Sequence, residues 1–355
     1  MGQRDRYGQQ DRRAAAAEVG QPAEVRQQGR AGAWVAYERA GFRYGRAAAA
    51  VRRGGPVRAA GSRPAQDSGT AERRRQFAEE ARSERPDLAL LCLLLGAEAG
   101  PVGPEEPRPV RPGDVSPDPY GIDAAQIELD RLAGLLPHGT RTPAGWASAL
   151  AELLGERHEF GGSSADYQRL ESSLLQQVLR RRRGLPILLS VVWIEVARRA
   201  GAPVYGVALP GHFVVGFGDP ERPVLVDPFA GGAPLTGEDA ELFVTGATGA
   251  RLEPSMLAPA RPLEIVLRIL NNIRAWAAAR PERTDVSLWA VDLSLLLPSH
   301  PARLRYERAQ LLVQRGEFQR GAAEMEEYAE VLDAIEPTTA EAVRHKAQAA
   351  RALLN

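Results

Sequence analysis

The 355-residue sequence has few of the residues that mark disulfide-rich, zinc-binding or membrane proteins. Cys92 is its only cysteine, which excludes an internal disulfide framework and a zinc site built from several thiolates. The longest apolar runs reach only about 10 residues, half of what a bilayer-spanning helix needs. The amino-terminal residues also lack the apolar centre of a secretory signal. We therefore expect a soluble, cytoplasmic protein.

Net charge is also lacking, because 45 basic and 45 acidic side chains cancel. The whole molecule has no general attraction to nucleic acid or to an acidic membrane, and we expect neither as a partner. Residues 1–70 differ, with 13 arginines against 6 acidic residues, a net charge of +7. A basic arm for nucleic acid is one interpretation of this segment. Its interspersed acids and sparse aromatics instead favour a disordered, low-complexity tail, or a start codon assigned too far upstream.

Hydrophobic periodicity indicates an α+β core in the middle of the chain. Amphipathic patterns predict helical segments over 71–100, 122–137, 142–160 and 174–184, the first two separated by a Pro-rich link. Residues 186–201 are apolar nearly all round and predict a buried central helix that ends at Gly201. Three Val-, Tyr- and Phe-rich runs predict short antiparallel strands over 203–209, 212–217 and 223–229.

The last hundred residues are predicted to be helical throughout. Short turns separate helical patterns over 261–280, 285–297, 301–316, 317–335 and 338–354. Gly316 and the small Ala322 and Ala323 are typical of tetratricopeptide-type packing. We predict three parts: the tail (1–70), an α+β domain with amino-terminal helices (71–260) and a helical repeat region (261–355).

One group of residues in the α+β core has the order of a catalytic site. The buried helix begins at Pro186, His212 lies in a strand-like run, and Asp227 ends the next strand. A nucleophile at a helix start, a base on one strand and an orienting acid on the next is the triad arrangement of thiol acyl-transfer enzymes. The alternative is a core histidine capped by a local aspartate, and the spacing alone leaves both open.

These residues carry a resemblance to a known family. The stretch "RRRGLPILLSVVWIEVARRAGAPVYGVALPGHFVVGF" followed by "VLVDPFAGG" resembles the SirB-type family of bacterial proteins. Supporting matches are "EFGGSSADY" upstream and "RILNNIRAW" downstream. The resemblance covers about residues 75–350 and implies a transglutaminase-like (papain-like) core followed by a tetratricopeptide-like region.

The resemblance also implies where the chemistry of the wider superfamily would lie. It assigns His212 as the base and Asp227 as the orienting acid. Active members carry a cysteine nucleophile at the start of the buried helix, where this sequence has Pro186 and Ile187. The preceding loop departs as well, with Ser172 in place of an asparagine and Arg169 in place of an acid. The resemblance therefore implies a pseudoenzyme, as for the family as a whole.

Other side chains are weaker candidates for a nucleophile or a ligand. Ser190, one turn into the helix, is expected to bond a preceding carbonyl. Ser172 and Ser173 flank the expected cleft, and Cys92 has the pattern of a buried apolar residue rather than a reactive thiol. One histidine and one aspartate are too few for a metal site, and no second histidine has ligand spacing. We expect no metal and no cofactor.

Two functions follow from these considerations. The first is a non-catalytic protein or peptide recognition module on a helical-repeat scaffold. In it, we expect the ligand to contact six residues near the cleft: Pro210, Gly211, Phe213, Asp166, Tyr167 and Ser172. The alternative is a hydrolase or acyl-transferase of altered chemistry, with His212 as general base oriented by Asp227. The sequence does not define the oligomeric state.

Overall fold

The computed structural model of the protein describes residues 64–100, 121–139 and 141–353. The elements before the sheet are α3 (Pro64–Glu80), α4 (Leu88–Ala97), α5 (Ile122–Gly134), α6 (Pro143–Leu150), the π-helix η1 (Ala151–Arg157), the 3₁₀ helices η2 (Ser164–Gln168) and η3 (Leu170–Ser173), α7 (Leu175–Arg181) and α8 (Pro186–Arg199). The sheet region contains β1 (Val204–Val207), β2 (Val214–Phe217), β3 (Val224–Asp227), η4 (Pro228–Ala230), β4 (Ala233–Leu235), α9 (Gly237–Thr248) and η5 (Pro254–Leu257). The carboxyl-terminal elements are α10 (Pro262–Ala278), η6 (Pro281–Arg283), α11 (Thr284–Leu296), α12 (Arg303–Gln314), α13 (Phe318–Asp333) and α14 (Pro337–Ala352).

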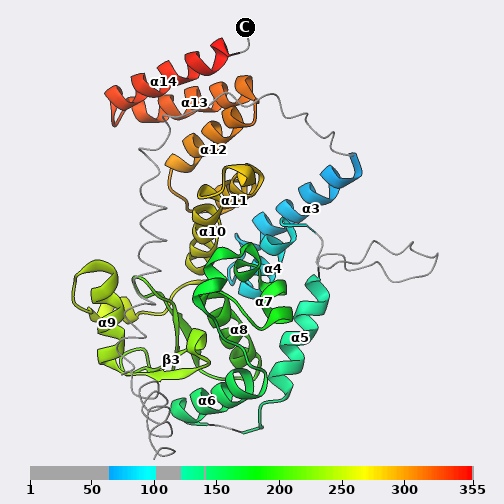
Figure 1. Cartoon of the computed structure of the whole chain (residues 1–355), viewed down its shortest axis with the longest axis vertical. Coiled ribbons are helices and arrows are strands. Elements are labelled where there is room, and N and C mark those ends of the chain that lie inside the picture. Colours follow the sequence, from blue (N-terminus) through cyan, green and yellow to red (C-terminus); the bar gives the residue numbers. More distant parts are fainter. Residues whose placement is uncertain (1–63, 101–120, 140, 354–355) are drawn as a thin grey trace, which may run out of the picture.

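These elements confirm the predicted α+β class, with a buried helix, a small antiparallel sheet and a helical carboxyl-terminal region (Figure 1). Most of the predicted tail and of the Pro-rich link lies outside the described residues. Residues 64–70 belong to α3. The segment 230–260 contains a fourth strand and helix α9, neither of which the sequence patterns predicted.

Helix α8 is the centre of the domain, as its apolar sequence predicted. Residues 186–197 are all buried, and Pro186 occupies the first turn, where its missing N–H costs no helical hydrogen bond. The one buried acid of this helix, Glu195, is compensated by two arginines of the last turn. Its Oε2 lies 2.8 Å from Arg198 Nη2 and 2.5 Å from Arg199 Nη1. A buried carboxylate without such partners would be strongly destabilising.

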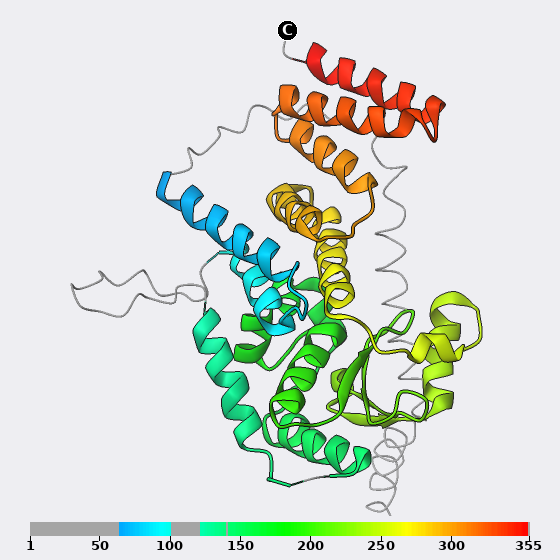
Figure 2. The same cartoon turned by 180° about the vertical axis from the view of Figure 1, so that it is seen from behind.

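The sheet is antiparallel with the strand order β1-β2-β3-β4. Side chains alternate between its two faces, as the period of a strand requires. Val215 and its partner Val226 join the main core that contains α8. Val214 and Leu225 join a second cluster, which α9 covers through Ala240 and Val244. The sheet is therefore enclosed between α8 on one face and α9 on the other (Figures 1 and 2).

The carboxyl-terminal helices do not all pack alike. Helices α10 and α11 contribute side chains such as Ile269, Leu270 and Ala290 to the same core as α8. Helices α12, α13 and α14 form a separate small core around Ala322, Met325 and Ala347. Helix α10 begins at Pro262, next to the predicted boundary, but the main core continues beyond that boundary as far as Leu297.

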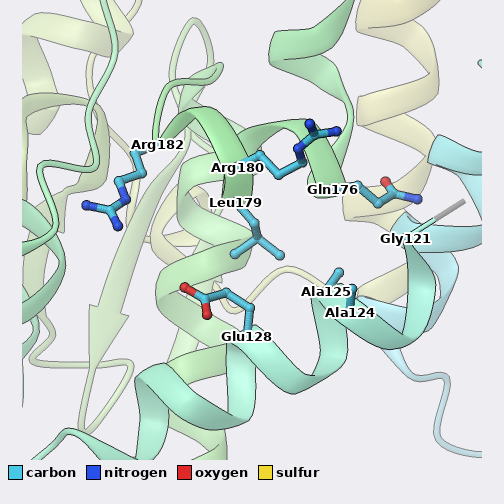
Figure 3. Close-up of a pocket in the computed structure, with 8 residues that line it drawn as sticks. All are labelled: Gly121, Ala124, Ala125, Glu128, Gln176, Leu179, Arg180 and Arg182. Atoms are coloured by element: carbon cyan, nitrogen blue, oxygen red, sulfur yellow. The ribbon is translucent and has the colours of Figure 1, made fainter. Parts of the chain in front are cut away.

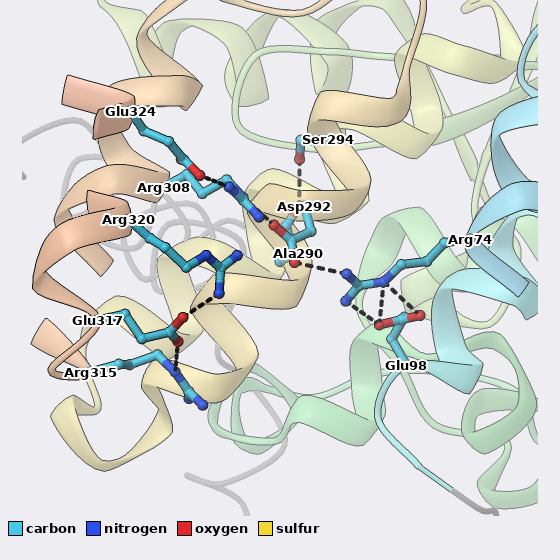
Figure 4. A network of polar contacts seen from close by, with 10 residues as sticks. All are labelled: Arg74, Glu98, Ala290, Asp292, Ser294, Arg308, Arg315, Glu317, Arg320 and Glu324. Carbon is cyan, nitrogen blue, oxygen red and sulfur yellow. Dashed lines mark hydrogen bonds and ion pairs between the residues drawn. The ribbon is translucent and has the colours of Figure 1, made fainter. Parts of the chain in front are cut away.

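A network of charged side chains joins the amino-terminal helices to the repeat helices (Figure 4). Arg74 of α3 lies 2.8 Å from Glu98, directly after α4, and 2.9 Å from Asp292 of α11. Asp292 also accepts a hydrogen bond from Arg308 of α12, which pairs in turn with Glu324 of α13. Five elements are thus linked through one half-buried chain of ion pairs.

Candidate functional site

His212 lies in a tight turn directly before β2, rather than within a strand. Its backbone N–H donates to Leu209 O at 3.2 Å, and Gly211 has a φ of +83°. Proline followed by glycine at the central positions is the pattern of a type II turn, whose second central residue needs a positive φ. The predicted ligand-contacting residues Pro210 and Gly211 therefore have a clear backbone role in placing His212.

The structure brings His212 and Asp227 together at the centre of the site. The distance from His212 Nε2 to Asp227 Oδ1 is 3.0 Å, and each residue is only 6% exposed. The same oxygen accepts a hydrogen bond from Phe229 N at 2.9 Å. The imidazole N–H does not point at the carboxylate, so Nε2 has no well-aligned hydrogen-bond partner among the described residues. The contact is close, but its hydrogen-bond angle is poor.

Aromatic rings cover the imidazole. The ring of Phe243, on α9, stacks on His212 with 4.3 Å between centroids and 10° between planes. Phe229 meets His212 edge-on at 6.3 Å, and Tyr167 meets Phe229 at 6.0 Å. The predicted residue Tyr167 thus reaches the site through Phe229. Phe243 was not predicted, because no motif in the segment 237–248 marks it.

The start of α8, where the triad arrangement requires a nucleophile, presents apolar side chains. Pro186 and Ile187 are both buried, and Ile187 is 2% exposed. Ser190 is buried as well, and its hydroxyl donates to Phe213 O at 3.3 Å. This bond differs from the expected bond to a preceding carbonyl, and it ties α8 to the residue that follows His212.

Cys92 is held in α4, within the main core. It is 1% exposed. Burial raises the pKa of its thiol well above the usual range, and the charges of Glu195 and Asp87 raise it further. Because the thiolate is the nucleophilic form, such a thiol is inert at neutral pH. The sequence-based interpretation of Cys92 as a buried apolar residue agrees with this placement.

Asp166 and Ser172 lie in a buried polar network of the loop before α7. Asp166 Oδ2 accepts hydrogen bonds from Ser163 N and Ser163 Oγ, both at 2.9 Å. Its Oδ1 accepts from Ser172 Oγ at 3.2 Å and lies 3.4 Å from Arg181 Nη2. The polar groups of both predicted ligand-contacting residues are therefore engaged within the loop. Ser172 also supports the start of α8, since its carbonyl accepts from Leu185 N at 2.9 Å.

Glycines allow the loop "EFGGSSADY" and the π-helix to approach the turn after Asp227. Gly162 N donates to Phe229 O at 2.9 Å, and a Cβ on Gly162 would lie 1.9 Å from the Phe229 ring. A Cβ on Gly155, within the π-helix, would lie 1.9 Å from the carbonyl oxygen of Gly231. Only glycine permits these approaches, which fix the position of the Asp227–Phe229 segment.

A hollow of the surface lies between α5 and α7, with a volume of about 280 Å³ (Figure 3). Its lining includes Glu128, Gln176, Arg180 and Arg182, and no residue of the His212 turn. Gln176 donates to Leu93 O at 2.7 Å, so its amide is directed toward α4. The hydrogen bond from Arg131 lowers the pKa of Glu128. The hollow is thus separate from the His212 site.

Within residues 64–100, 121–139 and 141–353, no group of three or more His, Cys, Asp or Glu side chains is arranged to hold a metal ion. Over the same ranges, no helix is both long enough and apolar enough to cross a membrane.

Comparisons with known proteins agree with this architecture. A family model described as transglutaminase-like superfamily matches residues 123–271, and a tetratricopeptide repeat model matches residues 273–355. The His212 turn, Asp227 and the start of α8 all fall within the first match, whereas the second match begins within α10.

Several curated proteins are similar over part of the chain. A UPF0162 protein of Xylella fastidiosa (strain 9a5c) is 36% identical over 164 residues, covering 44% of this chain and 58% of the relative. A UPF0162 protein of Vibrio cholerae is 28% identical over 191 residues, covering 52% of this chain and 70% of the relative. F-box only protein 21 of Mus musculus is 23% identical over 165 residues, covering 44% of this chain and 26% of the relative. The matched region thus spans little more than half the length of the Xylella relative. The chain combines a transglutaminase-like domain with a tetratricopeptide repeat region, and UPF0162 proteins are among its homologues.

Proposed function

We propose that the protein is a recognition module for a protein or peptide, in which a transglutaminase-like domain has no acyl-transfer activity. The repeat region supplies the scaffold, since helical repeats present extended surfaces suited to protein ligands. The His212 turn and its aromatic surroundings supply a second contact. Zero net charge favours a protein partner over nucleic acid.

The observation that carries this proposal is the apolar start of α8. Acyl transfer through a thiol needs a partly exposed thiolate within reach of the base. Ile187 is buried, Ser190 is hydrogen-bonded to Phe213 O, and the thiol of Cys92 is enclosed in the core. None of these side chains supports an activated nucleophile beside His212.

The proposal is tested by capturing partners from an extract of the native cells with the tagged full chain. Three baits are compared by quantitative mass spectrometry: the wild type, His212→Gln and the surface control Ser255→Ala. Ser255 is exposed and lies outside the site. We expect a partner that the wild type and Ser255→Ala retain and that folded His212→Gln loses. Recovery of the same proteins with all three baits would contradict a role of the His212 turn in recognition.

A second candidate function, hydrolysis with His212 as general base, is favoured by the 3.0 Å contact between His212 and Asp227. With Nε2 at the carboxylate, Nδ1 is the ring nitrogen left for a proton from a bound water. Such a hydrolase would need Phe243 to uncover the imidazole. It predicts that folded His212→Gln loses cellular function and that a product accumulates only with the wild type. Retention of cellular function by folded His212→Gln would exclude general-base catalysis by this residue.

A further inference from the structure

We propose that Arg268 of helix α10 is the positioning residue of His212. Its Nη2 donates hydrogen bonds to Leu209 O and to His212 O, both at 3.0 Å. These carbonyls belong to the first and last residues of the Pro210–Gly211 turn. One guanidinium group therefore closes the turn from outside, and hydrogen bonds from a charged donor are stronger than neutral ones. The inference rests on the part that His212 has in the proposed function.

The turn is held from two sides of the core. The guanidinium carbon of Arg268 lies 5.6 Å from the centroid of the Phe213 ring. On the other side, Ser190 of α8 donates to Phe213 O. An arginine suits this place because its planar group can donate to carbonyls while lying over an aromatic ring. A lysine at this position would keep the charge and lose the planar contact.

This contact makes α10 part of the site. Helix α10 shares the main core with α8 and α11, and its Arg274 donates to Glu307 of α12 at 3.0 Å. The run "RILNNIRAW" begins with Arg268, which gives that sequence match a physical role. The position of the imidazole relative to Asp227 thus depends on a helix that connects the two parts of the chain.

The test compares Arg268→Met with the matched control Arg280→Met. Arg280 follows the same helix by two residues, donates to Trp276 O at 2.8 Å and to Gln168 O at 3.2 Å, and lies over the Trp276 ring at 4.3 Å. It makes no contact with the His212 turn among the contacts described. Histidine-labelled full chain is studied by NMR, with His212 assigned from its loss in His212→Gln. The rate at which diethyl pyrocarbonate modifies His212 is measured by peptide mass spectrometry.

We expect diethyl pyrocarbonate to modify His212 about tenfold faster in Arg268→Met than in the wild type, because the charged hydrogen bonds that close the turn are lost. The His212 ring protons should also lose the upfield shift that the stacked Phe243 imposes. Arg280→Met should leave both readouts at their wild-type values, and Arg268→Lys should restore them in part. Wild-type values in folded Arg268→Met, or equal changes in Arg280→Met, would overturn the inference.

Folding is monitored separately by urea unfolding of each variant. Should Arg268→Met not fold, Arg268→Lys decides: wild-type readouts at His212 would overturn the inference, and an intermediate modification rate would support it. Neither readout involves a partner or a turnover. Failure of this inference therefore leaves the capture experiment unaffected, and the reverse also holds.

Discussion

The placements of Cys92 and His212 show which parts of a thiol-enzyme triad the chain can supply. Cys92 is the only thiol of the chain, yet it lies in the core of α4, where burial raises its pKa. His212 has the partner that the sequence order suggested, at 3.0 Å, but it lies under the ring of Phe243. The histidine and the aspartate that the triad order pairs lie together, and the start of α8, where that order requires a nucleophile, is apolar.

The raised pKa of Cys92 predicts a specific dependence of stability on pH. The folded state binds the thiol proton more tightly than the unfolded state, so the stabilisation is complete below the unfolded pKa of about 8.5 and is lost as pH rises toward the folded pKa. Between pH 8.5 and 10, the wild type should lose about 2 kcal/mol of unfolding free energy relative to Cys92→Ala. Urea unfolding of both proteins at pH 7 and pH 10 measures this. Parallel losses in the two proteins would show that Cys92 ionises freely in the folded state.

The sequence predicted the contact between His212 and Asp227, because that contact follows from the order of the strands along the chain. His212 comes shortly before β2 and Asp227 ends β3. Because these strands are antiparallel neighbours, the start of β2 lies beside the end of β3, and the two side chains are 3.0 Å apart. Phe243 and Arg268 could not be paired with His212 in this way. Their contacts join His212 to residues 31 and 56 positions later in the chain, and no pattern of the sequence pairs those segments.

At the scale of elements, the π-helix η1 and the turn after β3 depend on each other. The sequence predicted one continuous helix over 142–160, whereas α6 ends at Leu150 and a π-helix follows. Within it, Gly155 approaches Gly231 so closely that no side chain fits between them. π-helical turns occur often at functional sites, and this one supports the segment that carries Asp227 and Phe229.

The substitution Gly155→Ala should therefore be costly. A Cβ 1.9 Å from a backbone oxygen forces the π-helix and the turn apart, and we expect a loss of about 1–3 kcal/mol of unfolding free energy. Gly134→Ala is the matched control, since it adds the same methyl group to the last residue of α5 with nothing within 4 Å. Its stability should stay the same or rise slightly. Equal stabilities of the two variants in urea unfolding would refute the close approach.

Element type was predictable where the pattern was long and regular. The buried helix and the five carboxyl-terminal helical segments follow from apolar periodicity and from the prolines and glycines that mark helix ends. The strands are shorter than the predicted runs, because residues such as Leu209 and Phe229 belong to turns. Strand β4 and helix α9 carry weak patterns, since α9 buries only Ala240 and Val244.

At the scale of the whole molecule, the helical region is not simply attached to the domain. Helices α10 and α11 share the core of α8, and Asp292 links Arg74 of α3 to Arg308 of α12 (Figure 4). Burial lowers the pKa of Arg74, but its bonds to Glu98 and Asp292 outweigh burial and raise the pKa overall. This continuity involves contacts between residues more than 200 positions apart, which no sequence pattern reveals.

The ion-pair network predicts that Asp292→Asn weakens the whole chain. Asp292 is largely buried, and losing its charge leaves two guanidinium groups with one acidic partner each. We expect a loss of about 1–3 kcal/mol of unfolding free energy, smaller at high salt. Asp333→Asn, which removes one exposed ion pair with Arg344, should have little effect. A loss of the same size in both variants, or none in either, would contradict the network's role.

The central claim, recognition without acyl transfer, is tested most directly by intact-mass spectrometry. The full chain is incubated with the partner recovered by capture, and the masses of both proteins are followed over time alongside complex formation. The account predicts a complex that depends on His212, with both masses unchanged throughout. A covalent adduct on this chain, or a change in the partner's mass that is absent with His212→Gln, would contradict it.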